Sequence, residues 1–353
     1  MSEHMNVQWT SPVPCIRAGR CRYKRLDSDE PVSKCARLSD SSSDAGFLSS
    51  SPGSPVCTAP FSGTPTHQGP SRICQFLLLP VAERRGVHSA LNIQTGEEFV
   101  CKVFPVANYQ EKIRAHSALP EHRNISHIKD IILGDQNAYV FLEKDYGDMH
   151  TFVKSCKSLG EERAARLFYQ VASAVAHCHQ AGIVLGDLKL RKFVFSDEKR
   201  THLKLEGLED SHVLEGEDDS MSDKHGCPAY VSPEILISSG SYSGKQADAW
   251  SLGVILYTLL VGRYPFHDSD PGALFSKIRR GQYCLPEGLS PQAKCLLRSL
   301  LRKEPSERLT AAEVLIHPWF QSAQETGSTE QEAGSADQTV PTFSLGEDES
   351  LFC

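Results

Sequence analysis

Large hydrophobic residues are concentrated in the middle of the chain and are scarce at both ends. The first 70 residues are rich in Ser, Pro and Gly, and the chain turns polar again after Phe320, where 321–328 has the composition of a linker. Such segments bury too little apolar surface to offset the conformational entropy lost on folding. The pattern therefore predicts one folded domain over 71–320, between a disordered region at 1–70 and a disordered tail at 321–353.

Within the middle segment, apolar spacing and proline positions predict several elements. Phe99–Phe104 is rich in apolar and β-branched residues and predicts a strand. A short helix is expected over Tyr109–Leu119, because Pro105 and Pro120 bound it. Asp248–Tyr257 is apolar around most of its surface, which predicts a helix buried on nearly all sides.

Composition and charge argue against several classes of function. The 353 residues carry a formal net charge of −7, which gives no global case for nucleic-acid binding. There is no run of about 18 apolar residues and no apolar core of a signal peptide near residue 1, so no membrane span is expected. The 12 cysteines have neither a disulfide-framework nor a CxxC spacing, which fits reduced thiols. We therefore expect a soluble protein of the nucleus and cytoplasm.

The run Ile183–Phe195 resembles the catalytic loop of protein kinases, with parts missing. The usual pattern is His-Arg-Asp-Leu-Lys, two further residues and Asn. Here Asp187 and Lys189 are kept. The positions of His, Arg and Asn are taken by Leu185, Gly186 and Lys192.

Both protein ligands for Mg²⁺ are missing from this chain. The strand Leu203–Glu206 is followed by Gly207 where kinases have the Asp of Asp-Phe-Gly, and Lys192 replaces the catalytic-loop Asn. Two like unit charges ~4 Å apart repel by ~4 kcal/mol at an effective dielectric constant of ~20, so Lys192 should repel a metal ion. We expect no Mg²⁺. The alternative is a displaced carboxylate from Glu206 or Glu209.

The nucleotide cradle is also altered. The segment 77–86, where kinases have a Gly-rich loop, contains a single glycine and places Glu83 near the expected phosphates. Lys102 matches the phosphate-pairing lysine of Val-Ala-Ile-Lys. Its carboxylate partner should come from the short helix at 109–119 (helix C in kinases), where Glu111 is the best candidate. ATP binding should be weak or absent.

The rest of the kinase framework is present. The end of the activation segment reads Gly226–Glu234, with Ser-Pro-Glu in place of Ala-Pro-Glu. The resemblance implies that Arg308 pairs with Glu234 and that Asp248 begins the buried central helix. Glu234, Asp248 and Arg308 are therefore structural candidates. We expect an α+β, bilobal protein-kinase-like fold, with a small five-stranded lobe, a shortened helix C and a large helical lobe.

Particular departures from the kinase pattern resemble the Tribbles pseudokinases. They are Leu185–Phe193, the Leu-Glu after Gly207, Tyr146–His150, the N-terminal Lys34–Ser39 and the terminal Phe352-Cys353. The resemblance covers 71–320 and resumes in the tail. It implies a scaffold that holds substrates on its kinase-like domain. Such a scaffold recruits an E3 ubiquitin ligase of the constitutively photomorphogenic type through a C-terminal peptide.

The tail contains a candidate for that peptide, Asp337-Gln338-Thr339-Val340-Pro341, with Glu330 and Glu332 upstream. A basic rim on a β-propeller would attract the carboxylates, and an apolar pocket would take Val-Pro at a low entropic cost. The other Val-Pro pair, Val13-Pro14, lacks acidic neighbours. The apolar end Ser350–Cys353 could fold back near helix C and hide the motif until substrate binds.

The segment Leu315-Ile316-His317-Pro318-Trp319-Phe320 has two interpretations. In active kinases of the calmodulin-dependent class, Trp and Phe of His-Pro-Trp-Phe pack on the large lobe. In the Tribbles family, the same stretch is assigned to docking of MAP kinase kinases. The two roles are compatible.

The first hypothesis is a catalytically inactive adaptor. Gly207-Leu208-Glu209 and the activation segment would bind a substrate such as a CCAAT/enhancer-binding protein, and the tail would bring the ligase that marks it for degradation. The alternative is a weak, metal-independent kinase, with Asp187 as base and Lys189 facing the γ-phosphate. A third hypothesis is an inhibitor that docks MAP kinase kinases. Two basic clusters, at 20–25 and 34–37, could serve nuclear import or simply be solvated charges.

Overall fold

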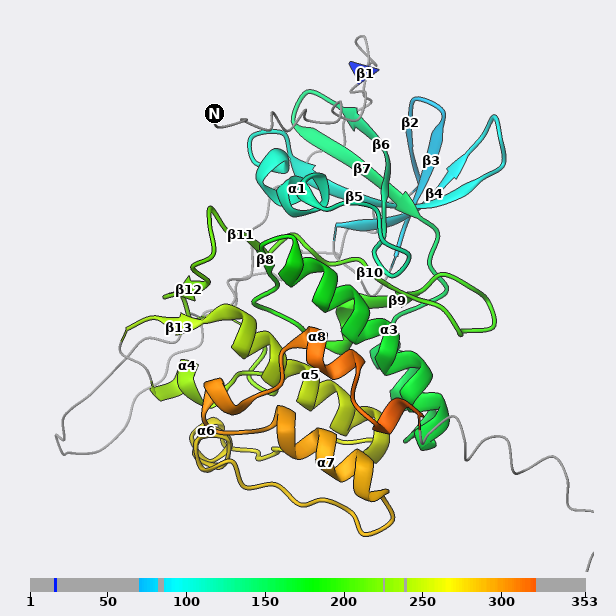
Figure 1. The fold of residues 1–353 in the computed structure, drawn as a ribbon. Coiled ribbons are helices and arrows are strands. Elements are labelled where there is room, and N and C mark those ends of the chain that lie inside the picture. Colours follow the sequence, from blue (N-terminus) through cyan, green and yellow to red (C-terminus); the bar gives the residue numbers. More distant parts are fainter. Residues whose placement is uncertain (1–15, 18–69, 82–85, 225, 238–239, 322–353) are drawn as a thin grey trace, which may run out of the picture.

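The computed structural model describes residues 16–17, 70–81, 86–224, 226–237 and 240–321. The N-terminal basic clusters, Glu83 and Asp337–Pro341 lie outside these residues. In the described part, a β-sheet with one short helix lies above a larger, mostly helical part (Figure 1). The predicted α+β, bilobal kinase-like fold is confirmed.

The small lobe is a curled sheet with the spatial order β1-β6-β7-β5-β4-β3-β2. Five of its strands, β3 to β7, correspond to the five predicted. The structure adds β2, antiparallel to β3, and the two-residue β1, parallel to β6. The strands are β1 Ile16–Arg17, β2 Ser71–Ile73, β3 Phe76–Pro80, β4 Val87–Asn92, β5 Glu98–Pro105, β6 Ile128–Leu133 and β7 Asn137–Glu143.

Strand β5 places Lys102 by simple alternation. Successive side chains of a strand point to opposite faces of its sheet. Cys101 is fully buried and packs with Phe76 and Phe141 on one face of the sheet. The neighbouring Lys102 therefore points to the other face, where α1 and the large lobe lie, and its backbone pairs with Val140 of β7.

Helix α1 runs over Tyr109–Ala118, with Leu119 as its C-cap, in close agreement with the predicted 109–119. Tyr109 and Ala115 are its buried residues. Tyr109 packs against β6 and β7. Ala115 belongs to the core of the large lobe, so this short helix contacts both lobes.

The large lobe is built around two long helices, α3 and α5 (Figure 1). The elements of this lobe are α2 Met149–Cys156, α3 Glu161–Gln180, β8 Ile183–Val184, η1 Leu190–Lys192, β9 Phe193–Phe195, β10 Leu203–Leu205, β11 His212–Val213, β12 Ser220–Met221, α4 Pro233–Ile237, β13 Tyr242–Ser243, α5 Gly244–Val261, α6 Pro271–Arg280, α7 Pro291–Leu300, η2 Pro305–Glu307 and α8 Ala311–Leu315.

Helix α5 is the predicted central helix, and 15 of its 18 residues are buried. The Ser243 side chain caps its N-terminus by accepting a hydrogen bond from the backbone N–H of Gln246. The helix ends at Gly262, in the left-handed conformation (φ +77°). A Cβ there would lie 1.6 Å from the carbonyl oxygen of Lys157, so only glycine lets α2 and α5 approach this closely.

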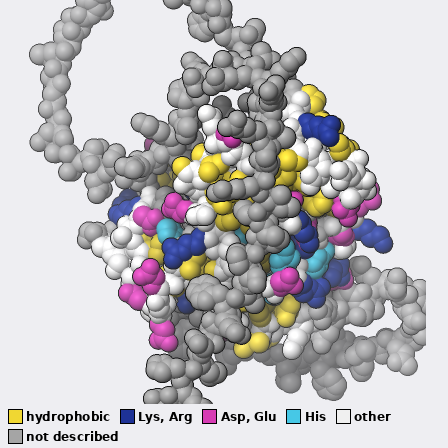
Figure 2. Space-filling view, turned by 90° about the horizontal axis from the view of Figure 1, so that it is seen from above, with side chains coloured by type: hydrophobic (Ala, Val, Ile, Leu, Met, Phe, Trp, Pro, Cys, Tyr) yellow, Lys and Arg dark blue, Asp and Glu magenta, His cyan; other side chains and the backbone are white. Residues whose placement is uncertain are grey.

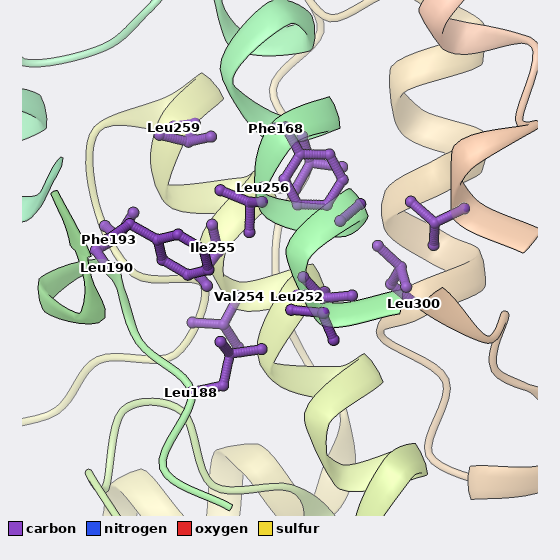
Figure 3. Close-up of a cluster of buried hydrophobic side chains, with 14 of the residues drawn as sticks. Phe168, Leu188, Leu190, Phe193, Leu252, Val254, Ile255, Leu256, Leu259 and Leu300 are labelled. Atoms are coloured by element: carbon purple, nitrogen blue, oxygen red, sulfur yellow. The ribbon is translucent and has the colours of Figure 1, made fainter. Parts of the chain in front are cut away.

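The core of the large lobe holds the catalytic-loop region in place. In Figure 3, Leu188, Leu190 and Phe193 lie against the side chains of α5. All three are at most 1% exposed. The loop therefore keeps its kinase-like course because its apolar residues are anchored, whatever polar residues stand between them.

Arg308 and Glu234 form the bidentate ion pair that the kinase resemblance implies. The two guanidinium nitrogens Nη1 and Nη2 each lie 2.6 Å from a carboxylate oxygen of Glu234. Arg308 also donates to the carbonyl oxygens of Gln246, Arg302 and Lys303. The pair therefore connects α4 to α5 and to the chain before α8.

Candidate functional site

The ammonium of Lys102 is held by two carboxylates from the other lobe. Its Nζ lies 2.5 Å from Glu209 Oε1 and 3.1 Å from Glu206 Oε1. All three side chains are largely buried. Glu111 of α1 is exposed and is not a partner of Lys102, so the predicted Lys102–Glu111 pair is wrong. Glu111 lies in the first turn of α1 with its side chain exposed, and the segment after β10 supplies the carboxylates instead.

The ammonium of Lys102 and the carboxylates of Glu206 and Glu209 stabilise one another's charges. Burial would lower the pKa of Lys102, but Glu206 and Glu209 offset this and the pKa lies above its usual value. Burial would raise the pKa of Glu209, but Lys102 offsets this and the pKa lies below its usual value. Lys102 and Glu209 are therefore both charged at neutral pH. The carboxylates proposed as displaced metal ligands are thus already paired with a lysine.

Lys192 occupies the space that the missing metal ligand would need. A Cβ built on Gly207 would lie 2.9 Å from Lys192 Cδ and 3.2 Å from its Cγ. The aliphatic stem of Lys192 therefore lies over Gly207, and it fits because position 207 has no side chain. Its Nζ lies 3.5 Å from Asp210 Oδ2 and 4.0 Å from Asp187 Oδ2. An ammonium thus stands beside the carboxylates that remain.

Asp187 is bound by the protein's own groups on several sides. Its carboxylate is paired with Lys189 and accepts a hydrogen bond from the backbone N–H of Cys227 at 3.2 Å. In active kinases this carboxylate accepts the substrate proton and the lysine meets the γ-phosphate. In this structure the lysine side chain turns back onto the carboxylate instead.

The altered positions Leu185 and Gly186 are fixed through their backbone. Leu185 is buried, and Gly186 has a left-handed φ of +68°. Their N–H groups donate to the two carboxylate oxygens of Asp248 at 2.8 and 3.0 Å, and His179 Nε2 lies 2.9 Å from the same carboxylate. Asp248 therefore positions the catalytic loop without needing the usual His and Arg side chains.

Two further residues complete the network, and the motif comparison did not identify them. Asp210 lies between Lys192 and Lys112 of α1, whose Nζ is 3.4 Å from Asp210 Oδ1. The acidic pair that follows Gly207 in the sequence, Glu209 and Asp210, was the signal that could have identified Asp210. The network then contains four lysines and four carboxylates, so it has no net charge. Its members are Lys102, Lys112, Lys189, Lys192, Asp187, Glu206, Glu209 and Asp210.

Little room remains beside Lys102. The space between β5, α1 and Glu209 has a volume of about 10 Å³, which is about enough for one water molecule. His116 of α1 also lines it. Both ring nitrogens of His116 are buried, and burial lowers its pKa to about 4. The carboxylates already on Lys102, and the Lys192 ammonium beside Asp187 and Asp210, do not fit a metal-bound nucleotide.

The segment Leu315–Phe320 is divided between core and surface. Trp319 is fully buried and Phe320 nearly so, and both pack near Phe168 of α3. By contrast, Ile316 is 82% exposed. The packing role considered for Trp and Phe is therefore observed, and the exposed residues of the segment are Ile316 and Pro318.

The predicted substrate-binding triplet is also only partly accessible. Leu208 is 1% exposed and belongs to the core of the large lobe. Glu209 is engaged by Lys102. Direct contact of Leu208 with another protein would require the segment to move.

In the described part of the chain, neither the surface charge nor the helices nor the possible metal ligands indicate a further site. Figure 2 looks down on the small lobe and shows Lys and Arg side chains interspersed with Asp and Glu. In the part of the chain that the structure describes, no helix has the length and apolar character needed to span a membrane. The same residues contain no group of three or more His, Cys, Asp or Glu that could hold a metal ion.

Comparison with known proteins gives consistent results. The protein kinase domain family matches residues 85–320. Tribbles homolog 1 of Homo sapiens is 61% identical over 339 residues, which cover 93% of this chain and 91% of that protein. Tribbles homolog 2 of Mus musculus is 55% identical, covering 97% of this chain and 98% of that protein. Tribbles homolog 3 of Mus musculus is 48% identical, covering 94% of both.

Proposed function

The chain belongs to the Tribbles family of pseudokinases, and we propose that it is an adaptor that brings a substrate protein to an E3 ubiquitin ligase. The observation that supports the proposal is the pairing of Lys102 with two carboxylates of the same chain. Its ammonium is paired with Glu206 and Glu209, so Lys102 is not free to pair with a nucleotide phosphate. A kinase fold with this site can still bind proteins through its surface.

The substrate side of the adaptor is the kinase-like domain. By family resemblance, we propose transcription factors of the CCAAT/enhancer-binding class as substrates. They would bind at the activation segment and at Gly207-Leu208-Glu209. Because Leu208 is buried, we expect this triplet to contribute by holding the start of the activation segment. The exposed residues at 215–218 would make direct contacts.

The ligase side is the tail. We propose that Asp337-Gln338-Thr339-Val340-Pro341 binds the propeller domain of a ligase of the constitutively photomorphogenic type. An acidic residue near a Val-Pro pair suits a basic rim around an apolar pocket, and the proline is already restrained before binding. We further propose that the adaptor works in both nucleus and cytoplasm.

Calorimetry with the full chain and the ligase propeller domain tests this proposal. The Val340→Ala, Pro341→Ala variant should lose binding. The matched control is Val13→Ala, Pro14→Ala, which removes the other Val-Pro pair and should leave affinity unchanged. Equal binding by all three proteins, or none by any, would reject the tail as the ligase-binding element.

A second function, docking of MAP kinase kinases, is supported by the exposure of Ile316. We propose that the contact is formed by Ile316 and Pro318, with the half-buried Leu315 and His317 beside them, and that the buried Trp319 and Phe320 hold the segment in place. An isoleucine 82% exposed beside a buried tryptophan is apolar surface available to a partner.

The alternative of a weak metal-independent kinase uses Lys102, Asp187 and Lys189. An Asp187→Asn variant separates the alternatives, because it removes the proposed base and leaves Lys102 paired with Glu206 and Glu209. An adaptor should keep its affinity for substrate and ligase, whereas a kinase should lose phosphoryl transfer in a radiolabel assay. Transfer by the wild type that this variant abolishes would favour the kinase.

A further inference from the structure

The anion that Lys102 binds is a carboxylate of the same chain. In active kinases this lysine pairs with nucleotide phosphate oxygens. Here Glu209 Oε1 lies 2.5 Å from Lys102 Nζ, at the distance of a strong charge-assisted hydrogen bond. The contact spans 107 residues of sequence and joins β5 of the small lobe to the segment after β10.

The cation beside Asp187 is also part of the chain. Lys192 Nζ lies between the carboxylates of Asp187 and Asp210, at 4.0 and 3.5 Å. Its stem fills the space above Gly207, where an aspartate would otherwise reach toward a metal ion. The Lys192 side chain is 8% exposed, so its charge is held inside the protein.

We propose that Glu209 and Lys192 are built-in ligands of the former nucleotide site. Glu209 takes the place of the nucleotide phosphate on Lys102, and Lys192 takes the place of the metal ion beside Asp187 and Asp210. The two substitutions balance, because the network has four positive and four negative side chains. If the chain had only Glu209 or only Lys192, a buried charge would be left without a partner.

This arrangement has a functional consequence. The contacts of Lys102 with Glu209 and of Lys112 with Asp210 fasten β5 and α1 to the start of the activation segment. In a kinase, nucleotide and metal stabilise this closure between the lobes. Here the chain's own side chains supply it, so the domain presented to partner proteins does not depend on the nucleotide or metal concentration of the cell.

The test uses the full chain and two charge-removing variants. Wild type should show no thermal shift with ATP in EDTA or with Mn²⁺ alone. Glu209→Gln should gain affinity for ATP in EDTA, and Lys192→Asn should gain affinity for Mn²⁺, each by about tenfold or more. The double variant should bind ATP with Mn²⁺. Wild-type binding as tight as that of the variants, or no gain in any variant, would overturn the proposal.

A separate ion-pair group, which shares no residue with the network, provides matched controls. Glu143 is also a carboxylate between lysines, Lys129 and Lys204. Glu143→Gln and Lys204→Asn remove one charge each from that group and should gain no affinity for ATP or Mn²⁺. A similar gain in these controls would show a nonspecific effect of net charge and would contradict the proposal.

Hydrogen exchange on the wild type decides the question if Glu209→Gln does not fold. Protection of α1 and of residues 206–210 should be the same with and without ATP and Mn²⁺, whereas added protection would overturn the proposal. The inference rests on the pseudokinase assignment and not on ligase binding. Ligase affinity of the same variants should be unchanged, which separates a failure here from a failure of the adaptor proposal.

Discussion

The indole nitrogen of Trp319 donates a hydrogen bond to the carboxylate of Glu161 at 2.9 Å. The same carboxylate accepts hydrogen bonds from the backbone N–H and the hydroxyl of Ser290, the N-cap of α7. Glu161 is the first residue of α3. One acidic side chain therefore joins α3, α7 and the end of the domain, and the tail leaves the domain two residues after this point.

We expect Trp319 to serve stability and Ile316 to serve binding. Trp319→Ala removes a fully buried aromatic side chain, so the free energy of unfolding in urea should fall by about 3–5 kcal/mol. Ile316→Ala changes an exposed residue and should alter it by less than about 0.5 kcal/mol. In a pull-down, Ile316→Ala should nevertheless weaken MAP kinase kinase binding. Intact binding by a folded Ile316→Ala protein would reject the docking proposal.

The Arg308–Glu234 pair should be essential for the large lobe. Arg308→Met leaves Glu234 without its bidentate partner, and loss of one member of a buried pair costs about 3–5 kcal/mol. Thermal unfolding should show a correspondingly lower midpoint. Arg166→Met, which breaks the exposed pair with Glu162, is the control and should leave the midpoint almost unchanged.

Lys102→Met should destabilise the domain even though no catalysis is lost. The substitution leaves Glu206 and Glu209 buried side by side without a cation, with an expected cost of about 3–5 kcal/mol. Adding Glu206→Gln and Glu209→Gln to Lys102→Met should restore most of the stability, because the charges are then absent together. A triple variant less stable than Lys102→Met in urea unfolding would contradict this account of the network.

Stability should fall as the pH decreases from 7 to 5 because of His116. Burial lowers its pKa to about 4 in the folded protein, against about 6.5 when unfolded. Between these values the unfolded chain binds a proton and the folded chain does not, so lowering the pH favours unfolding. The expected loss from pH 7 to pH 5 is about 2 kcal/mol, measured by urea unfolding.

Two variants test how much His116 contributes to the pH dependence of stability. His116→Leu should make the pH dependence between pH 7 and 5 shallower. Burial also lowers the pKa of four other histidines, which keep the remaining slope: His88, His122, His150 and His317. His267→Gln removes an exposed histidine and should leave the dependence as in the wild type. The same slope in His116→Leu as in wild type would assign the effect to another group.

The main architecture follows from local features of the sequence. The apolar surface of Asp248–Tyr257 specified a buried helix, and the two prolines around 109–119 limited helix α1. The missing metal ligands at positions 192 and 207 are visible because the catalytic loop and the following strand keep the kinase spacing. Each of these conclusions depends on residues close together in the chain.

The ion-pair network could not be predicted in the same way. The sequence suggested Glu111 as the partner of Lys102, which was wrong, and suggested Glu206 and Glu209 only as displaced metal ligands. The partner depends on where the tips of side chains more than 100 residues apart meet. That position is set by the orientation of α1 and by the course of the chain after β10.

The sequence by itself therefore determined the kinase-like fold, the missing metal ligands and the family, because these depend on residue types at fixed spacings. Only the tertiary structure decided that Glu209 occupies Lys102, that Lys192 fills the space above Gly207, and that Trp319 is core while Ile316 is surface. Ion pairing and burial depend on distances of a few ångströms between distant segments, and those distances exist only after both lobes have packed.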